Sequence, residues 1–276
     1  MRVRNYSVRV AMAAAVIAPA TLPVTAAAQQ RQVDTRAFEW SAKLDQGAWV
    51  RVANVNGGIT VGRANGDRVE VVASKSWRRG DPKDVTVEVK RIGPNGRDVI
   101  ICALYHENST CTERGIQSRD NDGWRHRNTD VMVQFTVLLP AGLNVSTGTV
   151  NGGIRVDGAT AEVKASTVNG GVEAYSSGGP VSATTVNGSI KASMSQLDGD
   201  ADLRYTTVNG SVVLELPRDA NADIEMRTVN GRLRTDFPIQ LRGRIDPRHI
   251  EAQLGKGGRR IRITTVNGSV ELRERP

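Results

Sequence analysis

The chain has 276 residues and a formal net charge of +8, without the blocks of like charge that mark a nucleic-acid-binding arm. This length fits one large domain or two small ones. All four tryptophans lie in the first half of the chain, which excludes an aromatic sugar-binding row along the second half: Trp40, Trp49, Trp77 and Trp124.

Residues 1–28 have the pattern of a secretory signal peptide. Arg2, Arg4 and Arg9 precede an apolar, alanine-rich run, and three alanines ending at Ala28 offer a cleavage site. The apolar run falls well short of the roughly 20 residues that a membrane span needs. We therefore expect export to the periplasm or the cell surface and cleavage near Ala28. The mature chain would have no transmembrane segment and a net charge of +5, because three arginines are removed from the total of +8.

Residues 29–140 form an N-terminal region that we predict to be rich in β-strands. Apolar and polar residues alternate in four segments, as in half-buried strands: 69–74, 85–92, 99–105 and 131–139. A first copy of the repeat described below lies within residues 38–61. We expect this copy to be the first coil of a stack, and the other strands to cover the open end of that stack.

The two cysteines, Cys102 and Cys111, belong to a chain that we expect to reach an oxidising compartment. An even number of cysteines there predicts a disulfide, and the short spacing favours a clip across a hairpin loop. The alternatives are two reduced thiols, or metal ligands together with His106.

Two segments interrupt the strand pattern. Residues 106–129 are polar and are predicted to be a long mobile loop rather than a ligand site. In residues 236–260, Asp246, Pro247 and Gly255 stand where a short helix has its N-cap, first residue and C-terminal glycine. This helix would replace a missing coil.

Residues 141–276 are dominated by a repeated Thr-Val-Asn-Gly unit. Val-Asn-Gly occurs seven times, beginning at Val55, Val150, Val168, Val186, Val208, Val229 and Val266. From Val150 onward the steps are 18, 18, 22, 21 and 37 residues, so the last step spans about two periods. Apolar and polar residues alternate on both sides of each copy, which predicts strand, turn, strand.

Two all-β architectures fit this repeat. Asn-Gly between alternating strands is a strong hairpin signal and would give an antiparallel β-meander or sandwich. In a β-solenoid, or β-helix, each repeat is one coil. We favour the solenoid because a meander of all repeats would exceed the roughly 10 strands at which open sheets curl or split. Coils about 4.8 Å apart would also place identical residues side by side.

In a solenoid the asparagines would form a structural ladder of hydrogen-bonded amides. That ladder would comprise Asn56, Asn151, Asn169, Asn187, Asn209, Asn230 and Asn267. Asn187 would lie in the middle of the stack, between Asn169 and Asn209, and Asn267 would lie near the end with one neighbour. We expect Asn and Gly here because both tolerate positive φ at the corner. The alternative is a row of asparagines that binds a ligand.

The sequence predicts no catalytic, cofactor or metal site. A polysaccharide-processing β-helix needs a column of carboxylates, whereas the residues at one outward position change from copy to copy: Lys164, Ser182, Arg204, Glu225 and Arg262. No arrangement of Ser, Cys and His forms a nucleophile motif. The three histidines, His106, His126 and His249, show no ligand spacing.

One acidic segment opens like a calcium loop. Residues 198–202 read Asp-Gly-Asp-Ala-Asp, but Leu203 and Asn209 stand where an EF-hand requires Gly and Glu. We interpret the segment as an acidic turn between strands.

The repeat behind a signal peptide is similar to the bacterial "putative adhesin" family, a β-strand-repeat domain of unknown function. The glycine-bearing residues 254–258 before the last copy, residues 261–270, also resemble it. The resemblance covers roughly residues 38 to 273. It implies surface adhesion and offers no catalytic residues to transfer.

The leading hypothesis is an exported, non-enzymatic envelope or surface protein, an adhesin or binding scaffold. Its partner would be a protein or polysaccharide of the envelope or surface, and not a nucleic acid. A regulatory or sensory module for envelope stress is the alternative. A β-helix enzyme that processes polysaccharide is a further, weaker alternative.

Overall fold

The computed structural model describes residues 31–118, 129–197, 201–241 and 246–275. The signal peptide predicted at residues 1–28 lies outside these ranges. Residues 31–276 form one compact unit built from β-strands, with two single-turn helices at Pro82–Asp84 and Pro94–Gly96. Within the described ranges, no helix is long and apolar enough to cross a membrane.

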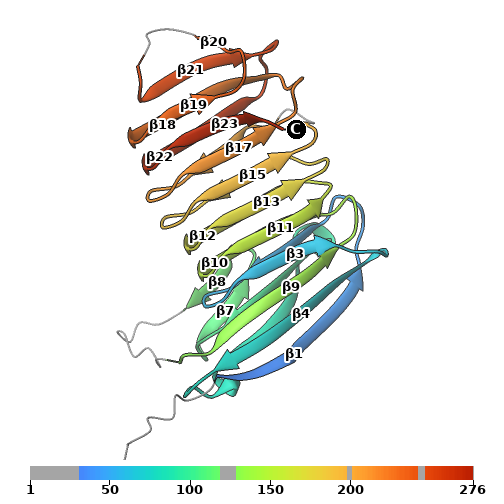
Figure 1. The fold of residues 1–276 in the computed structure, drawn as a ribbon. Coiled ribbons are helices and arrows are strands. Elements are labelled where there is room, and N and C mark those ends of the chain that lie inside the picture. The colour runs from blue at the N-terminus through green and yellow to red at the C-terminus, as the bar shows by residue number, and fades with distance from the viewer. Residues whose placement is uncertain (1–30, 119–128, 198–200, 242–245, 276) are drawn as a thin grey trace, which may run out of the picture. The chain divides into compact units, whose positions relative to one another are not determined.

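Two large β-sheets contain nearly all the strands (Figure 1). In spatial order, sheet A consists of β1 (Gln32–Lys43), β4 (Arg68–Trp77), β9 (Met132–Leu139), β3 (Ile59–Arg63), β11 (Ile154–Ala159), β13 (Val172–Ser176), β15 (Ile190–Met194), β17 (Val212–Leu216), β23 (Val270–Glu274) and β19 (Leu233–Thr235). Sheet B consists of β20 (Gln240–Leu241), β21 (His249–Leu254), β18 (Ala222–Asn230), β22 (Arg260–Asn267), β16 (Leu203–Thr206), β14 (Val181–Thr184), β12 (Val163–Asn169), β10 (Asn144–Asn151), β2 (Trp49–Ala53), β6 (Asp98–Leu104) and β5 (Thr86–Ile92). A small hairpin pairs β7 (Ser109–Thr112) with β8 (Gly115–Ser118).

Each repeat is one coil that gives a strand to sheet B and, after the Asn-Gly turn, a strand to sheet A. Equivalent strands of neighbouring coils pair in parallel and in register, as in Val145 with Val163 and Ile154 with Val172. The β-solenoid prediction is therefore confirmed. The meander alternative is wrong, because its turns would join antiparallel partners.

The core lies between the two sheets, since every second side chain points inward. In β12, Val163, Ala165 and Thr167 are buried, whereas Lys164 and Ser166 between them are exposed. Among the largest buried side chains is Tyr205, and burial raises the pKa of its hydroxyl. One contiguous apolar cluster thus runs through the coils.

The coils do not stack in chain order at the C-terminal end. The last coil, β22/β23, lies between β16/β17 and β18/β19, although it follows both in the chain. Figure 1 shows the red strands β22 and β23 between orange neighbours. Asn267 therefore lies second from the end of the asparagine row, and the expectation that it has only one neighbouring asparagine is wrong.

The short helix predicted within residues 236–260 is replaced by a strand. Residues 249–254 form β21, which pairs antiparallel with β18 and, on its other side, with β20. Ala252 and Leu254 alternate into the core, and the free edge of β18 offers unpaired backbone groups to a strand. Asp246 does accept a local hydrogen bond from the backbone N–H of Arg248 at 2.8 Å, but it serves a turn rather than a helix.

At the N-terminal end, β2 and β3 form the first coil that carries the motif. Beyond it, β6 and β9 continue the two sheets in parallel, and β5, β4 and β1 complete them in antiparallel order. β6 is buried on both faces, which explains its almost unbroken apolar sequence.

Candidate functional site

The Thr-Val-Asn-Gly turns form one long edge of the stack, here named the motif edge. Six of the seven copies have a threonine that points inward, and its hydroxyl donates a hydrogen bond to the glycine carbonyl of an adjacent coil; the first copy has Asn54 in its place. These bonds run from Thr149 to Gly57, Thr167 to Gly152, Thr185 to Gly170, Thr207 to Gly188, Thr265 to Gly210 and Thr228 to Gly268, all at 2.8 or 2.9 Å. The threonine therefore ties neighbouring coils together.

The glycine of each copy is required by close approach between coils. A Cβ on Gly188 would lie 2.0 Å from the carbonyl oxygen of Gly170, and the other copies from Gly152 onward have equally short distances. Positive φ, which the sequence predicted at this corner, is not the general reason. Only Gly57 and Gly268 of the seven glycines have it, and the one described non-glycine residue with positive φ is Asn95.

The seven asparagines form a continuous ladder of side-chain amides. Each Nδ2 donates to the Oδ1 of the next asparagine at 2.8 or 2.9 Å, in the order Asn230, Asn267, Asn209, Asn187, Asn169, Asn151 and Asn56. The order follows the stack and not the chain. The ladder is exposed to solvent, so each amide bond is worth less than a buried one.

The valine of each copy points outward. A row of exposed valines, here named the valine strip, runs beside the asparagines and consists of Val150, Val168, Val186, Val208 and Val229, with exposed fractions of 37 to 52%. Two residues before each valine, on the same outward face, four of the coils carry a hydroxyl: Ser166, Thr184, Thr206 and Thr264. The strip is therefore a surface of methyl groups, flanked by hydroxyls in four coils and by Arg227 beside Val229.

On the sheet A side of the motif edge lies a shallow groove with a volume of about 430 Å³. Its lining combines small residues with charged ones: Gly153, Gly171, Ser189, Thr60, Arg155, Glu173 and Lys191, with Ile59, Ile154 and Val172. Arg155 forms an ion pair with Glu173. Beside the groove, the Tyr175 ring is flanked by Arg155 Cζ at 5.4 Å and Lys191 Nζ at 5.8 Å from its centroid. The groove therefore offers both apolar surface and charged side chains.

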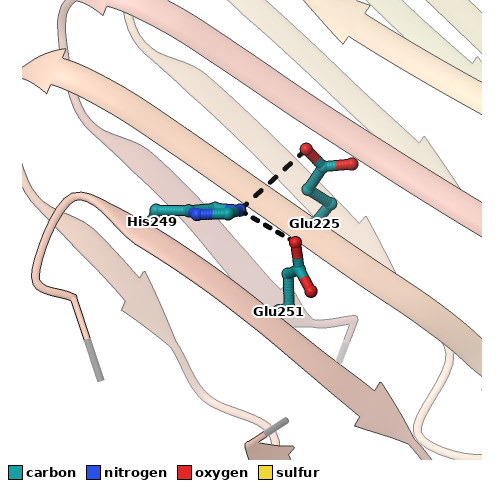
Figure 2. Close-up of side chains that lie close together, drawn as sticks. All are labelled: Glu225, His249 and Glu251. Atoms are coloured by element: carbon teal, nitrogen blue, oxygen red, sulfur yellow. Dashed lines mark ion pairs between the residues drawn. The ribbon is translucent and has the colours of Figure 1, made fainter. Parts of the chain in front are cut away.

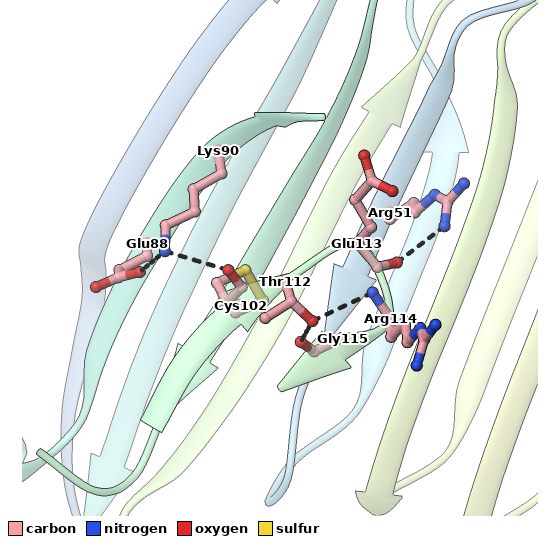
Figure 3. Close-up of a disulfide and its surroundings, with 9 residues drawn as sticks. Arg51, Glu88, Lys90, Cys102, Thr112, Glu113, Arg114 and Gly115 are labelled. Atoms are coloured by element: carbon pink, nitrogen blue, oxygen red, sulfur yellow. Dashed lines mark hydrogen bonds and ion pairs between the residues drawn. A yellow bond between two sulfur atoms is a disulfide. The ribbon is translucent and has the colours of Figure 1, made fainter. Parts of the chain in front are cut away.

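The structure brings Cys102 and Cys111 together as a disulfide with Cα atoms 5.8 Å apart (Figure 3). The bond joins β6 to the β7–β8 hairpin, and a second apolar cluster fills the space between them: Ile92, Ile100, Cys102, Leu104 and Cys111. Arg51 donates to the Glu113 carbonyl at 3.0 Å, and Lys90 donates to the Cys111 carbonyl at 3.1 Å. The hairpin thus covers the outward face of β6.

This hairpin corrects the prediction of one long loop over residues 106–129. Residues 109–112 and 115–118 are strands, because the alternating Ser109 and Cys111 can bury against β6. His126 and part of the acidic segment, residues 198–200, lie outside the described residues.

Sequence reasoning missed two features. The outward direction of the valines follows from strand alternation. Their exposure could not be predicted, because it depends on the other described elements leaving the motif edge uncovered. The second feature is a cluster around His249, which strand pairing assembles from separate segments and which is described below.

Comparison with solved structures finds matches of low sequence identity. A solved structure titled "putative cell adhesion protein" from Clostridium sporogenes is 10% identical, with a TM-score of 0.45, covering 89% of this chain and 99% of its own. A "putative adhesin" from Bacteroides fragilis is 11% identical, with a TM-score of 0.31, covering 90% and 99%. No curated protein matches the sequence.

The family comparison is more direct. The model of the Toastrack DUF4097 family matches residues 126–273, which is more than half of the chain. The match includes six of the seven Val-Asn-Gly copies and confirms the resemblance that the repeat indicated. The chain therefore belongs to the Toastrack DUF4097 family, a β-rich bacterial domain of unknown function.

Proposed function

We propose that this protein is an exported, non-enzymatic binding scaffold of the cell envelope or surface, and that the valine strip is its contact surface. One observation carries the proposal. Within the motif, Thr ties coils together, Asn forms the ladder and Gly permits close approach, whereas the outward Val lies outside the buried core in every copy.

The strip has the physical properties of a binding surface. Its methyl groups repeat at about the 4.8 Å spacing of neighbouring strands from Val150 to Val208, and the half-buried Val266 lies between Val208 and Val229. Contiguous exposed apolar surface marks interaction sites, and the neighbouring hydroxyls add hydrogen-bonding groups. Because both sheets hold the strip rigidly, a partner would lose little binding free energy to ordering it.

Export is supported by two independent features. The first 28 residues have the pattern of a signal peptide, and the Cys102–Cys111 disulfide is typical of an oxidising compartment. A lack of catalysis is supported by the outward columns of the coils. Glu173, for example, has Arg155 and Lys191 as its neighbours in the column rather than a second carboxylate.

The proposal is tested with the full chain and a triple variant, Val168→Thr, Val186→Thr and Val208→Thr. Threonine keeps the β-branched shape and removes apolar surface. We expect the fraction of protein that co-sediments with envelope preparations to fall roughly tenfold or more, with an unchanged melting temperature. Treating the envelopes with protease or with polysaccharide-degrading enzymes distinguishes the two classes of partner.

A matched triple variant on the other sheet, Thr60→Ser, Lys191→Gln and Glu271→Gln, is the control and should bind as the unaltered protein does. Equal binding by the valine variant, or an equal loss by the control, would show that the valine strip is not the contact surface.

A further inference from the structure

At the C-terminal end of the stack, strand pairing brings Glu225, His249 and Glu251 together (Figure 2). Glu225 lies on β18 and faces Glu251 on the antiparallel strand β21, and His249 lies two residues before Glu251. Residues two apart in a strand share a face, so all three side chains point away from the core on the outer face of sheet B. The segment that supplies His249 and Glu251 is the one that the sequence predicted to be a helix, in which these two would not share a face.

The distances suit one shared ion. His249 Nε2 lies 3.2 Å from Glu251 Oε1 and 4.0 Å from Glu225 Oε1, and the three ligand atoms all lie within 4.8 Å of one another. A tetrahedral zinc ion with bonds of 2.0–2.2 Å holds its ligand atoms roughly 3.3–3.6 Å apart. Small side-chain rotations would bring the Glu225 oxygen into this range.

The imidazole nitrogen is already directed into the cluster. His249 Nε2 is shielded from solvent and accepts or donates no hydrogen bond within the part of the chain that the structure describes. A shielded nitrogen that makes no hydrogen bond is costly, and coordination of a cation would satisfy it.

The charges leave a place for a cation between the two glutamates. Like charges directly opposite each other on paired strands repel. Arg262 Nε lies 2.8 Å from Glu225 Oε2, and Arg227 Nε lies 3.2 Å from Glu225 Oε1. The ion pair that the structure gives Glu251 is with His249, so Glu251 gains most from an added positive charge.

We propose that Glu225, His249 and Glu251 bind a divalent first-row transition-metal ion of the Zn²⁺ class. The imidazole nitrogen selects such an ion over Mg²⁺ and Ca²⁺, which prefer sites made of oxygen ligands. Three protein ligands leave a fourth tetrahedral position for water. Arg227 competes with the ion for Glu225 Oε1, so the affinity is moderate.

Bound metal would fasten the end of the stack. It would join β21, which covers the free edge of the β18/β19 coil, to β18 within that coil. Because the three ligands come together only when these strands are paired, metal binding would stabilise the folded protein. The site is separate from the valine strip, so its failure would leave the proposed function standing.

The test is titration of the full chain with ZnCl₂, using a chromophoric zinc chelator as competitor. We expect one bound Zn²⁺ per chain, a higher melting temperature with Zn²⁺, and no effect of equal Mg²⁺ or Ca²⁺. His249→Ala and Glu251→Gln should each weaken binding at least tenfold. Glu173→Gln is the control. It changes an exposed glutamate on β13 that pairs with Arg155, and the variant should bind Zn²⁺ as the unaltered chain does.

Arg227→Gln provides a test in the opposite direction. Removing this competing charge should tighten Zn²⁺ binding about threefold to tenfold, because one unit charge a few ångströms away acts through a high effective dielectric near the surface. Circular dichroism would verify that each variant folds, and Glu251→Gln is the mildest change because its side chain is half exposed. The proposal is overturned if the unaltered chain binds no Zn²⁺ below millimolar concentration. It is equally overturned if His249→Ala and Glu251→Gln bind as tightly as the unaltered chain.

Discussion

Neighbouring coils in the stack are either consecutive in the chain or brought together by insertion of a later coil. Coils such as β12/β13 and β14/β15 follow one another in the chain, whereas β22/β23 enters between two coils that precede it. The contacts are nevertheless the same. The Asn187 and Asn267 amides each donate to a neighbouring asparagine at 2.8 Å, and Thr207 and Thr265 each donate to a neighbouring glycine carbonyl at 2.8 Å. The motif therefore makes coils interchangeable and does not determine their order.

The order of the coils in the stack differs from their order in the chain because of the path that the chain takes after β17. After β17 the chain passes over one position and forms β18 and β19. It then pairs β21 with the free edge of β18, and β20 with β21, before β22 and β23 fill the vacant position. In chain order, the C-terminal coil would instead be an open edge, prone to fraying and to pairing with other chains. Insertion gives that coil a partner on both sides.

The strongest test of this difference is deletion of residues 259–276, which removes β22 and β23. An inserted coil leaves a gap between two others, and its loss exposes the core around Ile261, Ile263 and Leu272. We expect a loss of more than about 5 kcal/mol in the free energy of unfolding, which is comparable with the whole stability of many domains. Urea unfolding followed by circular dichroism would measure it.

Deletion of Pro276 alone is the control and should change little. If the shortened chain instead unfolds cooperatively within a few degrees of the full chain, the last coil behaves as a terminal one and the inserted position is wrong.

A second test addresses the contact that every coil shares. In Gly188→Ala the new Cβ would meet the Gly170 carbonyl oxygen at 2.0 Å, so two coils would have to separate. We expect a loss of about 3 kcal/mol or more in the free energy of unfolding. Gly153→Ala is the control, because its Cβ would lie 3.5 Å from the nearest atom, the Gly171 carbonyl oxygen, and should cost less than about 0.5 kcal/mol. Equal effects of the two substitutions would contradict the close-approach explanation.

A third test separates the inward threonines from the outward ones. Thr207→Val removes the hydroxyl that donates to the Gly188 carbonyl and should cost about 1–2 kcal/mol. Thr206→Val changes the neighbouring half-exposed side chain and should leave the melting temperature within about a degree or two, as for most surface substitutions. Were Thr206→Val the more damaging change, the two faces of the strand would have been assigned the wrong way round.

Much of the fold could be predicted because alternation and repetition are local signals. The apolar residues of Val163–Thr167 indicated which face of the strand is buried, and the regular spacing indicated coils. Other features could not be predicted, for physical reasons. Since every coil carries the same interface, the sequence contains no signal for the inserted position of β22/β23.

Two local predictions were wrong because the same residues serve more than one structure. Asp, Pro and Gly end strands and form turns as readily as they begin and end helices, as Asp246, Pro247 and Gly255 show. Residues 249–254 form a strand because they pair with the free edge of β18. The glycines were expected for their backbone freedom, but contact between coils requires them. The His249 cluster was not visible, because Glu225 lies 24 residues away in the chain and meets it only through pairing of β18 with β21.

The substitutions with the smallest expected effects, in the asparagine ladder, distinguish the two possible stacking orders most directly. The difference between their effects depends only on the order of the coils. Asn267 has an amide partner on both sides, Asn209 and Asn230, whereas Asn230 ends the ladder and has one. Because these bonds are exposed, Asn267→Ala should lower the free energy of unfolding by about 1–2 kcal/mol and Asn230→Ala by about half as much. Asn187→Ala, in the regular part of the stack, should match Asn267→Ala. Stacking in chain order would reverse the first comparison, because Asn230 would then have two partners and Asn267 one. Thermal and urea unfolding of the three variants would therefore determine the order of the coils. A greater loss of unfolding free energy from Asn230→Ala than from Asn267→Ala would refute the inserted position of β22/β23.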